Sequence, residues 1–266
     1  MIFLLMALWE WHAARRPQAI VRRRRWPANL SIVALDALLV RLLFPAAAVG
    51  AALYASGQGW GLFNLVAMAD WLAVLLAVLL LDVTIYFQHR LFHALPWLWR
   101  LHRMHHADLE YDVTTGLRFH PLEILLSMII KITLVVLLGA PALAVLIFEV
   151  LLNATSLFNH GNVRLPLSLD RWLRLLLVTP DMHRVHHSII RAETDSNFGF
   201  SVPWWDRLFA TYRAQPAAGH LGMTIGIEAF RSVDDLRLGR LLLQPFVNVE
   251  RPDSGATSEK ADDAAG

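Results

Sequence analysis

Long apolar runs separated by short polar segments set the pattern of the first part of the chain. Residues 28–55 form one such run and residues 65–87 form a second. The uncharged stretch "SGQGWGLFN" (Ser56–Asn64) lies between them. A helix of about 20 apolar residues crosses the hydrocarbon core of a bilayer. The pattern therefore predicts two membrane-spanning helices joined by a short turn.

A third apolar stretch, Pro121–Phe158, is interrupted in its middle by "GAP" (Gly139–Pro141). A Gly and Pro break inside an apolar run marks a turn, so two limbs of about 18 residues should form a hairpin that enters the membrane and returns. Lys131 and Glu149 are each nine residues from Ala140, so they fall at a similar depth. Lone charges are costly at that depth, and we expect these two side chains to pair.

The N-terminal region, residues 1–27, combines an apolar segment with a basic one. Met1–Ala13 is apolar but about half as long as a membrane span, and it lacks the basic start and cleavage site of a signal peptide. It predicts an interfacial helix or the end of a truncated span. Six arginines follow between Arg15 and Arg25.

Residues 28–250 are expected to form one membrane-embedded domain. Within it, residues 220–246 predict an amphipathic helix that packs beneath the rest. Residues 251–266, "RPDSGATSEKADDAAG", are small and polar, which predicts a disordered tail.

The composition supports a membrane protein. The chain is 56% hydrophobic and 17% charged, with a mean hydropathy of +0.45, whereas about 25% of the residues of soluble domains are charged. The absence of cysteine excludes disulfides, cysteine-held iron–sulfur clusters, thiolate zinc sites and a cysteine nucleophile. The basic balance comes mostly from arginine clusters, which a bilayer explains better than nucleic acid does.

Those arginine clusters also predict an orientation. They lie at Arg15–Arg25, Arg90–Arg118 and Arg164–Arg174, while the two intervening turns carry no Arg or Lys. The positive-inside rule places all three clusters on the cytoplasmic side. Every histidine except His12 and His220 then lies on that side as well.

Together these patterns predict an all-α integral membrane protein with about four transmembrane or hairpin helices. A cytoplasmic helical cap, formed by Pro96–Leu117 and Leu165–Tyr212, would carry most of the histidines. We expect a multi-pass protein of a bacterial-type inner membrane or its equivalent, with its site on the cytoplasmic side.

The histidines are the main candidates for chemistry. Three of their groups have spacings of three or four residues, which place side chains on one helix face. An H-x2-HH triplet occurs twice, about eighty residues apart, which is hard to obtain by chance. If the groups fold together, eight ring nitrogens meet in one pocket. The groups are His89 and His93; His102, His105 and His106; and His183, His186 and His187.

Local patterns around these groups support a metal site. Asp82, Tyr86, His89 and His93 fall on one stripe of a helix, and a carboxylate behind a ligating histidine fixes its tautomer. Before the second triplet, "TPD" predicts a helix start.

In that helix start Thr179 is the N-cap, Pro180 the first helical residue and Asp181 lies in the first turn. The helix N-terminus disfavours imidazolium at His183 and so keeps its ring available for a metal.

Other interpretations account for the histidines less well. Isolated histidines such as His12 and His220 are usually surface or satisfied core residues. A basic surface for lipid phosphates would use Arg or Lys rather than mostly neutral rings. Two haems would want one imidazole per helix face, and a zinc protease needs an HExxH motif that the sequence lacks. A multi-histidine metal cluster fits best.

The motifs "HRLFH", "LHRMHH" and "MHRVHH", each at the end of an apolar segment, resemble the membrane-bound fatty acid hydroxylase/sterol desaturase superfamily. The resemblance covers about Asp82 to Tyr212 and includes "FHPLE", "NHGN" and "TDSNFGFSVPWWDRLFATY". It implies a histidine-ligated di-iron centre that uses O2 to hydroxylate or desaturate a C–H bond of a membrane lipid, whether fatty acyl, sterol-like or ether lipid.

The resemblance also implies which residues hold the metal. His120 is left open as a ligand, a partner of a ligand or a substrate contact, and Asp82, Asp181 and Asn162 are candidates to hydrogen-bond the ligands. The implied ligands are His89, His93, His102, His105, His106, His160, His183, His186 and His187. Iron rests on the resemblance alone, because all-nitrogen sites generally bind zinc more tightly than ferrous iron, and a purified sample can carry zinc.

The implied reaction needs two electrons from outside the chain. The sequence shows no Gly-rich dinucleotide loop after a strand, so we expect a separate ferredoxin or cytochrome-type donor with its reductase. The arginine-rich face is the expected docking surface. The alternative function is a membrane sensor or carrier that binds metal without oxygenase activity. The candidate histidine ligands of this chain gather on one side of the membrane, which argues against a transporter.

Overall fold

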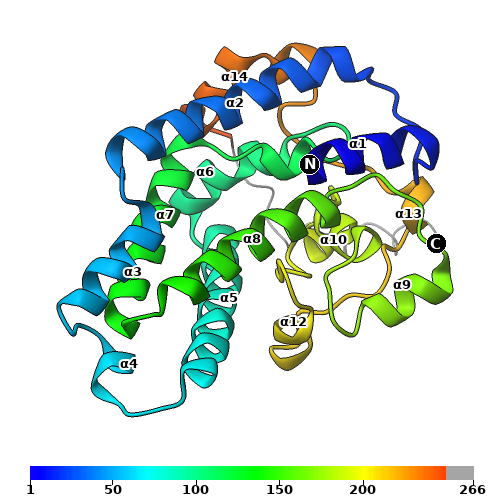
Figure 1. Ribbon diagram of the computed structural model, residues 1–266. Coiled ribbons are helices and arrows are strands. Elements are labelled where there is room, and N and C mark those ends of the chain that lie inside the picture. The colour runs from blue at the N-terminus through cyan, green and yellow to red at the C-terminus, as the bar shows by residue number, and fades with distance from the viewer. Residues whose placement is uncertain (250–266) are drawn as a thin grey trace, which may run out of the picture.

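The computed structural model describes residues 1–249, and over that range the protein is all-helical, without β-strands (Figure 1). The predicted tail at residues 251–266 lies outside the described residues. The α-helices are α1 (Ile2–His12), α2 (Arg22–Leu43), α3 (Ala47–Gly57), α4 (Leu62–Leu65), α5 (Asp70–Ala94), α6 (Pro96–His106), α7 (Pro121–Leu138), α8 (Ala142–Asn159), α9 (Leu167–Leu173), α10 (Pro180–His186), α11 (Arg191–Thr194), α12 (Trp204–Leu208), α13 (Gly219–Gly222) and α14 (Leu238–Leu243). The 3₁₀ helices are η1 (Thr115–Leu117), η2 (Val233–Leu236) and η3 (Gln244–Phe246).

Four segments are long and apolar enough to cross a membrane: residues 22–65, α5, α7 and α8. Between 17% and 33% of the most apolar window of each is buried inside the protein. Most of their apolar side chains therefore face outward, which in water would be a large unfavourable exposure. A surface of this kind suits a lipid environment.

The first predicted span is two helices rather than one. α2 ends at Leu43 and α3 begins at Ala47, because Pro45 disfavours helical backbone at Phe44, which has φ −130° and ψ 65°. The two helices meet at an angle (Figure 1), and both pack against α7. Apolar patterning does not register this bend because both pieces are hydrophobic.

The two uncharged turns predicted to lie on one side of the membrane do meet in the structure. Gly61 and Gly139 have positive φ values of 92° and 61°, and a β-carbon built on Gly61 would lie 2.0 Å from the Gly139 nitrogen. Only glycine fits such a backbone approach. The turn after α3 and the α7–α8 turn therefore form one end of the bundle.

The predicted pairing of charges in the hairpin is confirmed. Lys131 Nζ lies 2.8 Å from Glu149 Oε1, joining α7 to α8. Nearby, small residues such as Ala48, Ala77 and Ala144 let α3, α5, α7 and α8 approach closely in the main core.

The opposite end of the bundle gathers the histidine-bearing segments. α5 continues past the apolar run through His93, which confirms the predicted helical stripe, and α6 follows immediately after the helix break at Leu95. α7 begins and α8 ends at this same end, and α10 packs against α8. The predicted cap at Thr179 is confirmed, since its side chain accepts a hydrogen bond from Met182 N and Pro180 is the first residue of α10.

The prediction of one amphipathic helix over residues 220–246 is wrong. The segment contains only the short elements α13, η2, α14 and η3. Gly226 has a φ of 107° and its nitrogen donates to His187 O, while Ile189 N donates to Thr224 O. The backbone here serves as an extended partner for the chain after α10, so it is not free to form a helix.

The 11-residue helix α1 is held against the histidine end through a buried acid. Glu10 Oε1 accepts from Val113 N at 2.7 Å and from Asn162 N at 2.8 Å, and its other oxygen pairs with Arg22. Leu4, Leu8 and Trp11 of the same helix are exposed. One face of α1 is thus fixed to the protein, while the other exposes apolar side chains.

Candidate metal centre

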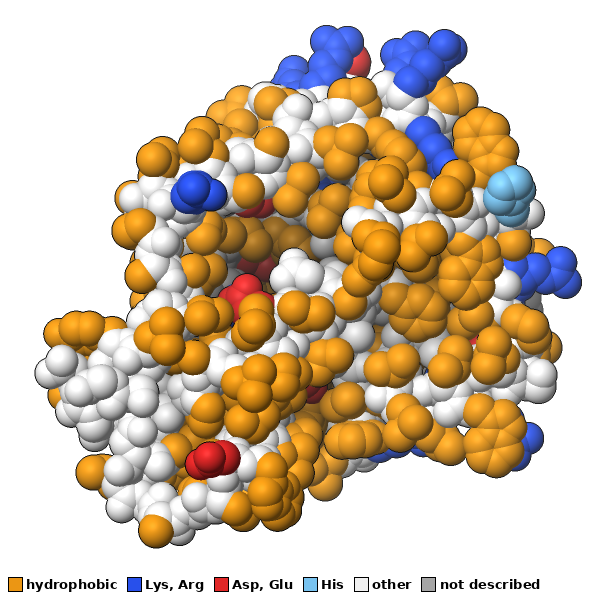
Figure 2. All heavy atoms as spheres, in the orientation of Figure 1, with side chains coloured by type: hydrophobic (Ala, Val, Ile, Leu, Met, Phe, Trp, Pro, Cys, Tyr) orange, Lys and Arg blue, Asp and Glu red, His pale blue; other side chains and the backbone are white. Residues whose placement is uncertain are grey.

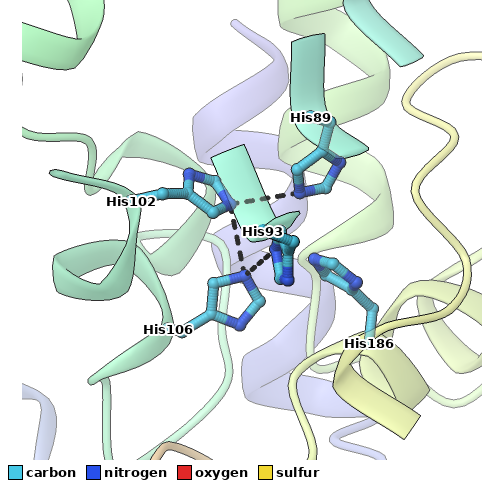
Figure 3. A group of neighbouring side chains, drawn as sticks. All are labelled: His89, His93, His102, His106 and His186. Atoms are coloured by element: carbon cyan, nitrogen blue, oxygen red, sulfur yellow. Dashed lines mark hydrogen bonds between the residues drawn. The ribbon is translucent and has the colours of Figure 1, made fainter. Parts of the chain in front are cut away.

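Nine histidines from four segments converge in two neighbouring groups. Within each group the potential ligand nitrogens lie within 4.8 Å of one another, and none of the nine side chains is more than 4% exposed. Figure 3 shows the first group, whose rings point toward a common centre from α5, α6 and α10. The first group is His89, His93, His102, His106 and His186, and the second is His105, His160, His183 and His187.

The doubled histidines divide between the two groups. Adjacent residues on a helix point about 100° apart, so His106 and His186 face the first group whereas His105 and His187 face the second. The rings of His106 and His187 stack with centroids 4.5 Å apart, which places the groups side by side. The sequence predicted eight nitrogens in one pocket, whereas the structure has two adjacent centres and brings the loop residue His160 into the second.

Hydrogen bonds fix the tautomer of several rings. A carbonyl oxygen can only accept, so a ring nitrogen against it must carry the proton, and the other nitrogen of a neutral imidazole then carries a lone pair. Four rings use Nδ1 in this way: His89 donates to Phe198 O (2.8 Å), His105 to Arg118 O (3.2 Å), His160 to Ser156 O (2.8 Å) and His186 to Ser196 O (2.7 Å).

The inward nitrogens consequently face one another with lone pairs. His105 Nε2 and His160 Nε2 are 3.2 Å apart although both Nδ1 atoms are already protonated. Such a contact is repulsive unless a cation lies between the rings. Other ring nitrogens of the two groups have no hydrogen-bond partner among the described residues. They include His186 Nε2 and both nitrogens of His187. The donor set therefore fits metal ions.

Burial keeps these rings neutral at physiological pH. It lowers the pKa of His102 to about 3 and the pKa of His160 to about 4. Burial, reinforced by neighbouring rings, also holds the pKa of His105, His106 and His187 well below the usual value. A neutral imidazole is the metal-binding form, so no proton has to be displaced.

Two carboxylates support rings of the first group, and the sequence analysis did not identify either of them. Glu123 Oε1 lies 2.7 Å from His102 Nδ1, and Asp195 Oδ1 lies 3.3 Å from His93 Nδ1. A carboxylate behind a ligating histidine orients the ring and raises its basicity. Both acids belong to motifs that carried the family resemblance, "FHPLE" and "TDSNFGF", which was the available signal.

The four residues suggested to support the ligands lie elsewhere. Asp82 does share the buried face of α5 with the histidines, but its Oδ2 accepts from Trp205 Nε1 at 2.7 Å. Asn162 pairs with the backbone of Arg16 through both side-chain atoms. His120 caps α7, accepting from Leu122 N.

Asp181 accepts hydrogen bonds from Arg15 and Arg184 and lies 3.5 Å from His220 Nε2. It therefore connects the N-terminal arginine segment to α10. Its role is to fix the position of the helix that carries His183 and His186 rather than to contact their rings.

A buried ion cluster fixes the loop between α6 and α7. Arg25 bonds Asp108 at 2.6 and 2.8 Å and Asp112 at 2.7 Å, while Arg118 donates to Met104 O. The Arg25 side chain is completely buried, so this member of the arginine run is structural. Since Arg118 O accepts a hydrogen bond from His105 Nδ1, the cluster positions a ring of the second group.

An elongated cavity of about 460 Å³ leads to the first group. Side chains of α2, α5, α7 and α8 line it, and His89 and His102 form part of its wall. Figure 2 shows a hollow in this face, surrounded mainly by hydrophobic side chains, with acidic side chains inside it and at its rim. The volume is within the range of pockets that hold small organic ligands.

Comparison with known proteins agrees with this geometry. Residues 74–211 match the fatty acid hydroxylase family. The chain is 31% identical to an ornithine lipid hydroxylase of Rhizobium tropici over 57% of its length and 45% of the relative's. It is 29% identical to human alkylglycerol monooxygenase over 66% of its length and 38% of the relative's. Rat cholesterol 25-hydroxylase is 27% identical over 56% and 49% of the two chains.

The chain belongs to the fatty acid hydroxylase family, because the match covers just over half of its residues and includes all nine converging histidines. The aligned regions span less than half the length of each of these three relatives. No solved structure matches the chain.

Proposed function

We propose that the protein is a membrane-bound, O2-dependent lipid hydroxylase whose two histidine groups each hold one iron ion. The observation that carries this proposal is the pair of adjacent, buried, neutral imidazole clusters at the inner end of an apolar cavity. Family membership and the names of the relatives, which act on an ornithine lipid, alkylglycerol and cholesterol, support the same reaction class.

The nine histidines are the proposed ligands, five at one ion and four at the other. Two iron ions bound there would supply the activation of O2 that attack on an unreactive C–H bond requires. Glu123 and Asp195 orient His102 and His93, and backbone carbonyls orient four further rings. The ligands are thereby held in place before a metal enters, which reduces reorganisation on binding.

The apolar cavity gives the protein its second task, which is to place one carbon of a lipid beside the metals and to exclude water. Inserting one oxygen atom into a C–H bond while reducing the other to water consumes two electrons and two protons. We infer that a separate ferredoxin or cytochrome-type protein supplies the electrons from the cytoplasmic side, where the arginine clusters would face. Desaturation, with loss of two neighbouring hydrogens, would use the same residues.

Metal analysis combined with oxygen uptake tests the proposal. The purified full chain, reconstituted with ferrous iron, should bind about two metal ions and consume O2 when reductant and membrane lipid are both present. His105→Ala should abolish uptake while the protein still inserts into membranes. Two bound metals without lipid-dependent uptake would instead indicate a metal-binding protein, and absence of metal binding would refute the site.

A further inference from the structure

The largely apolar cavity beside the first histidine group also carries a row of polar side chains. On α7 the polar residues Glu123, Ser127 and Lys131 recur every fourth position, which places them on one helix face, and all three line the cavity. Glu149 and Asn153 of α8 line it in the same way. The eight helical steps from Glu123 to Lys131 span about 12 Å of helix. A cavity that binds only hydrocarbon would not require a row of polar side chains.

Three acceptor oxygens in this cavity lack a hydrogen-bond partner among the described residues. They are Oδ1 of Asp36, Oε1 of Gln88 and Oε2 of Glu123. Asp36 is only 6% exposed and sits on α2 in an otherwise apolar stretch. A buried acceptor without a donor is costly, which points to a donor supplied from outside the chain.

Two of the three unpartnered acceptors lie at the metal end of the cavity. Gln88 directly precedes His89, and Glu123 already bonds His102 through its other oxygen. Gln88 donates from its amide nitrogen to Ser127 Oγ at 2.7 Å, while its side-chain oxygen is buried without a partner among the described residues. Asp36 of α2 lines the same cavity as these two residues.

We propose that this cavity binds a lipid through hydroxyl or amino groups that donate to Asp36, Gln88 and Glu123, so that the carbon presented to the metals lies within a few bonds of those groups. The assignment rests on the function proposed above and specifies its substrate class. An ionised phosphate offers mainly acceptor oxygens, so it would leave these acceptors unpaired. A featureless acyl chain would leave all three acceptors unpaired.

Three ligands that share the same alkyl chain and differ in their polar group test this without turnover. The full-length protein is loaded with zinc, which supports no redox chemistry, and its unfolding midpoint is followed in detergent against hexadecane-1,2-diol, its dimethyl ether and hexadecyl phosphate. The diol should bind at least about tenfold more tightly than the dimethyl ether, because only the diol donates hydrogen bonds. Hexadecyl phosphate should bind most weakly.

Asp36→Asn should reduce the preference for the diol severalfold or more, whereas Asp70→Asn, a change at an exposed acid at the start of α5, should leave it intact. Equal binding of the diol and its ether by the unmodified protein would overturn the inference, and so would an unchanged preference in D36N. Those results can coexist with normal metal loading and oxygen uptake, so they leave the proposed function standing. Absence of metal binding would refute the proposed function alone, because the ligand comparison can be repeated on the metal-free protein.

Discussion

Lys131 Nζ and Glu149 Oε1 lie 2.8 Å apart and tie the two limbs of the α7–α8 hairpin together. The lysine side chain is 10% exposed and the glutamate 30%, and both line the cavity that leads to the histidines. The ion pair therefore neutralises two charges within an apolar segment and also forms part of the cavity wall.

Removing one member of this pair should cost more than removing both. Lys131→Met leaves Glu149 without its counter-ion, and we expect a loss of about 1–3 kcal/mol in the free energy of unfolding, reduced from the cost of a fully buried pair because Glu149 is partly exposed. The double variant K131M/E149L should recover part of that loss. Denaturant titration of the two single variants and the double variant measures the coupling, and strict additivity would show that the pair contributes nothing.

Glu123→Gln should weaken metal binding while the fold persists. Gln cannot offer a carboxylate to His102 Nδ1, and loss of such support typically costs about 10–100-fold in metal affinity. Competition with a metal chelator measures the change. Asp82→Asn is the matched control, since Asp82 bonds Trp205 instead of a histidine and an amide oxygen can still accept from the indole. Equal effects of the two changes would contradict the assignment of Glu123.

His160 and His120 should behave in opposite ways. His160→Ala removes one of the four nitrogens of the second group, so the metal content of the purified protein should fall from about two ions toward one. His120→Ala removes a helix cap and should leave the metal content unchanged while costing about 1 kcal/mol of stability. Elemental analysis and thermal unfolding distinguish them, and loss of metal from H120A would require a different role for that residue.

Gly61→Ala should be strongly destabilising. A β-carbon would collide with the Gly139 backbone, and φ at Gly61 is 92°, so we expect a loss of about 2 kcal/mol or more. Gly57→Ala offers a fair control, because nothing lies within 4 Å of its added carbon and its φ is ordinary. Unfolding midpoints of the two variants should differ clearly, and similar values would mean that the two turns do not pack as described.

Glu10 should make stability depend on pH. Burial, with a contribution from Asp112, raises the pKa of Glu10 from 4.5 to about 7. The folded protein therefore binds more protons than the unfolded chain between these values, and the contribution of Glu10 to stability falls as the pH rises through that window. The total change is about 3 kcal/mol.

The difference between the unmodified protein and Glu10→Gln isolates this effect, because Gln cannot titrate but can still accept from Val113 N and Asn162 N. The variant should gain stability relative to the unmodified protein as the pH rises from 4.5 to 7. Parallel curves for the two proteins across that window would show that Glu10 is not responsible.

Much of the fold could be predicted because apolar runs and their breaks are local properties. The spans, the hairpin at Gly139–Pro141 and the Lys131–Glu149 pair all follow from length and from symmetry about a turn. The bend at Pro45 and the irregular course of residues 220–246 did not follow. The bend has a local cause in Pro45, but apolar patterning does not register it because both helices are hydrophobic. The course of residues 220–246 depends on backbone pairing with the chain after α10, which no local pattern encodes.

For the site, the sequence by itself determined which residue type gathers and at what spacing, since i, i+3 and i+4 positions must share a helix face. Only the tertiary structure decided that the rings divide into groups of five and four, because the direction of each of two adjacent rings depends on how α6 and α10 are set against α5 and α8. The tertiary structure also places Glu123 and Asp195, and not Asp82, beside the histidine rings. The partner of a carboxylate is set by distances between elements of the fold, and the spacing of residues along one helix does not predict those distances.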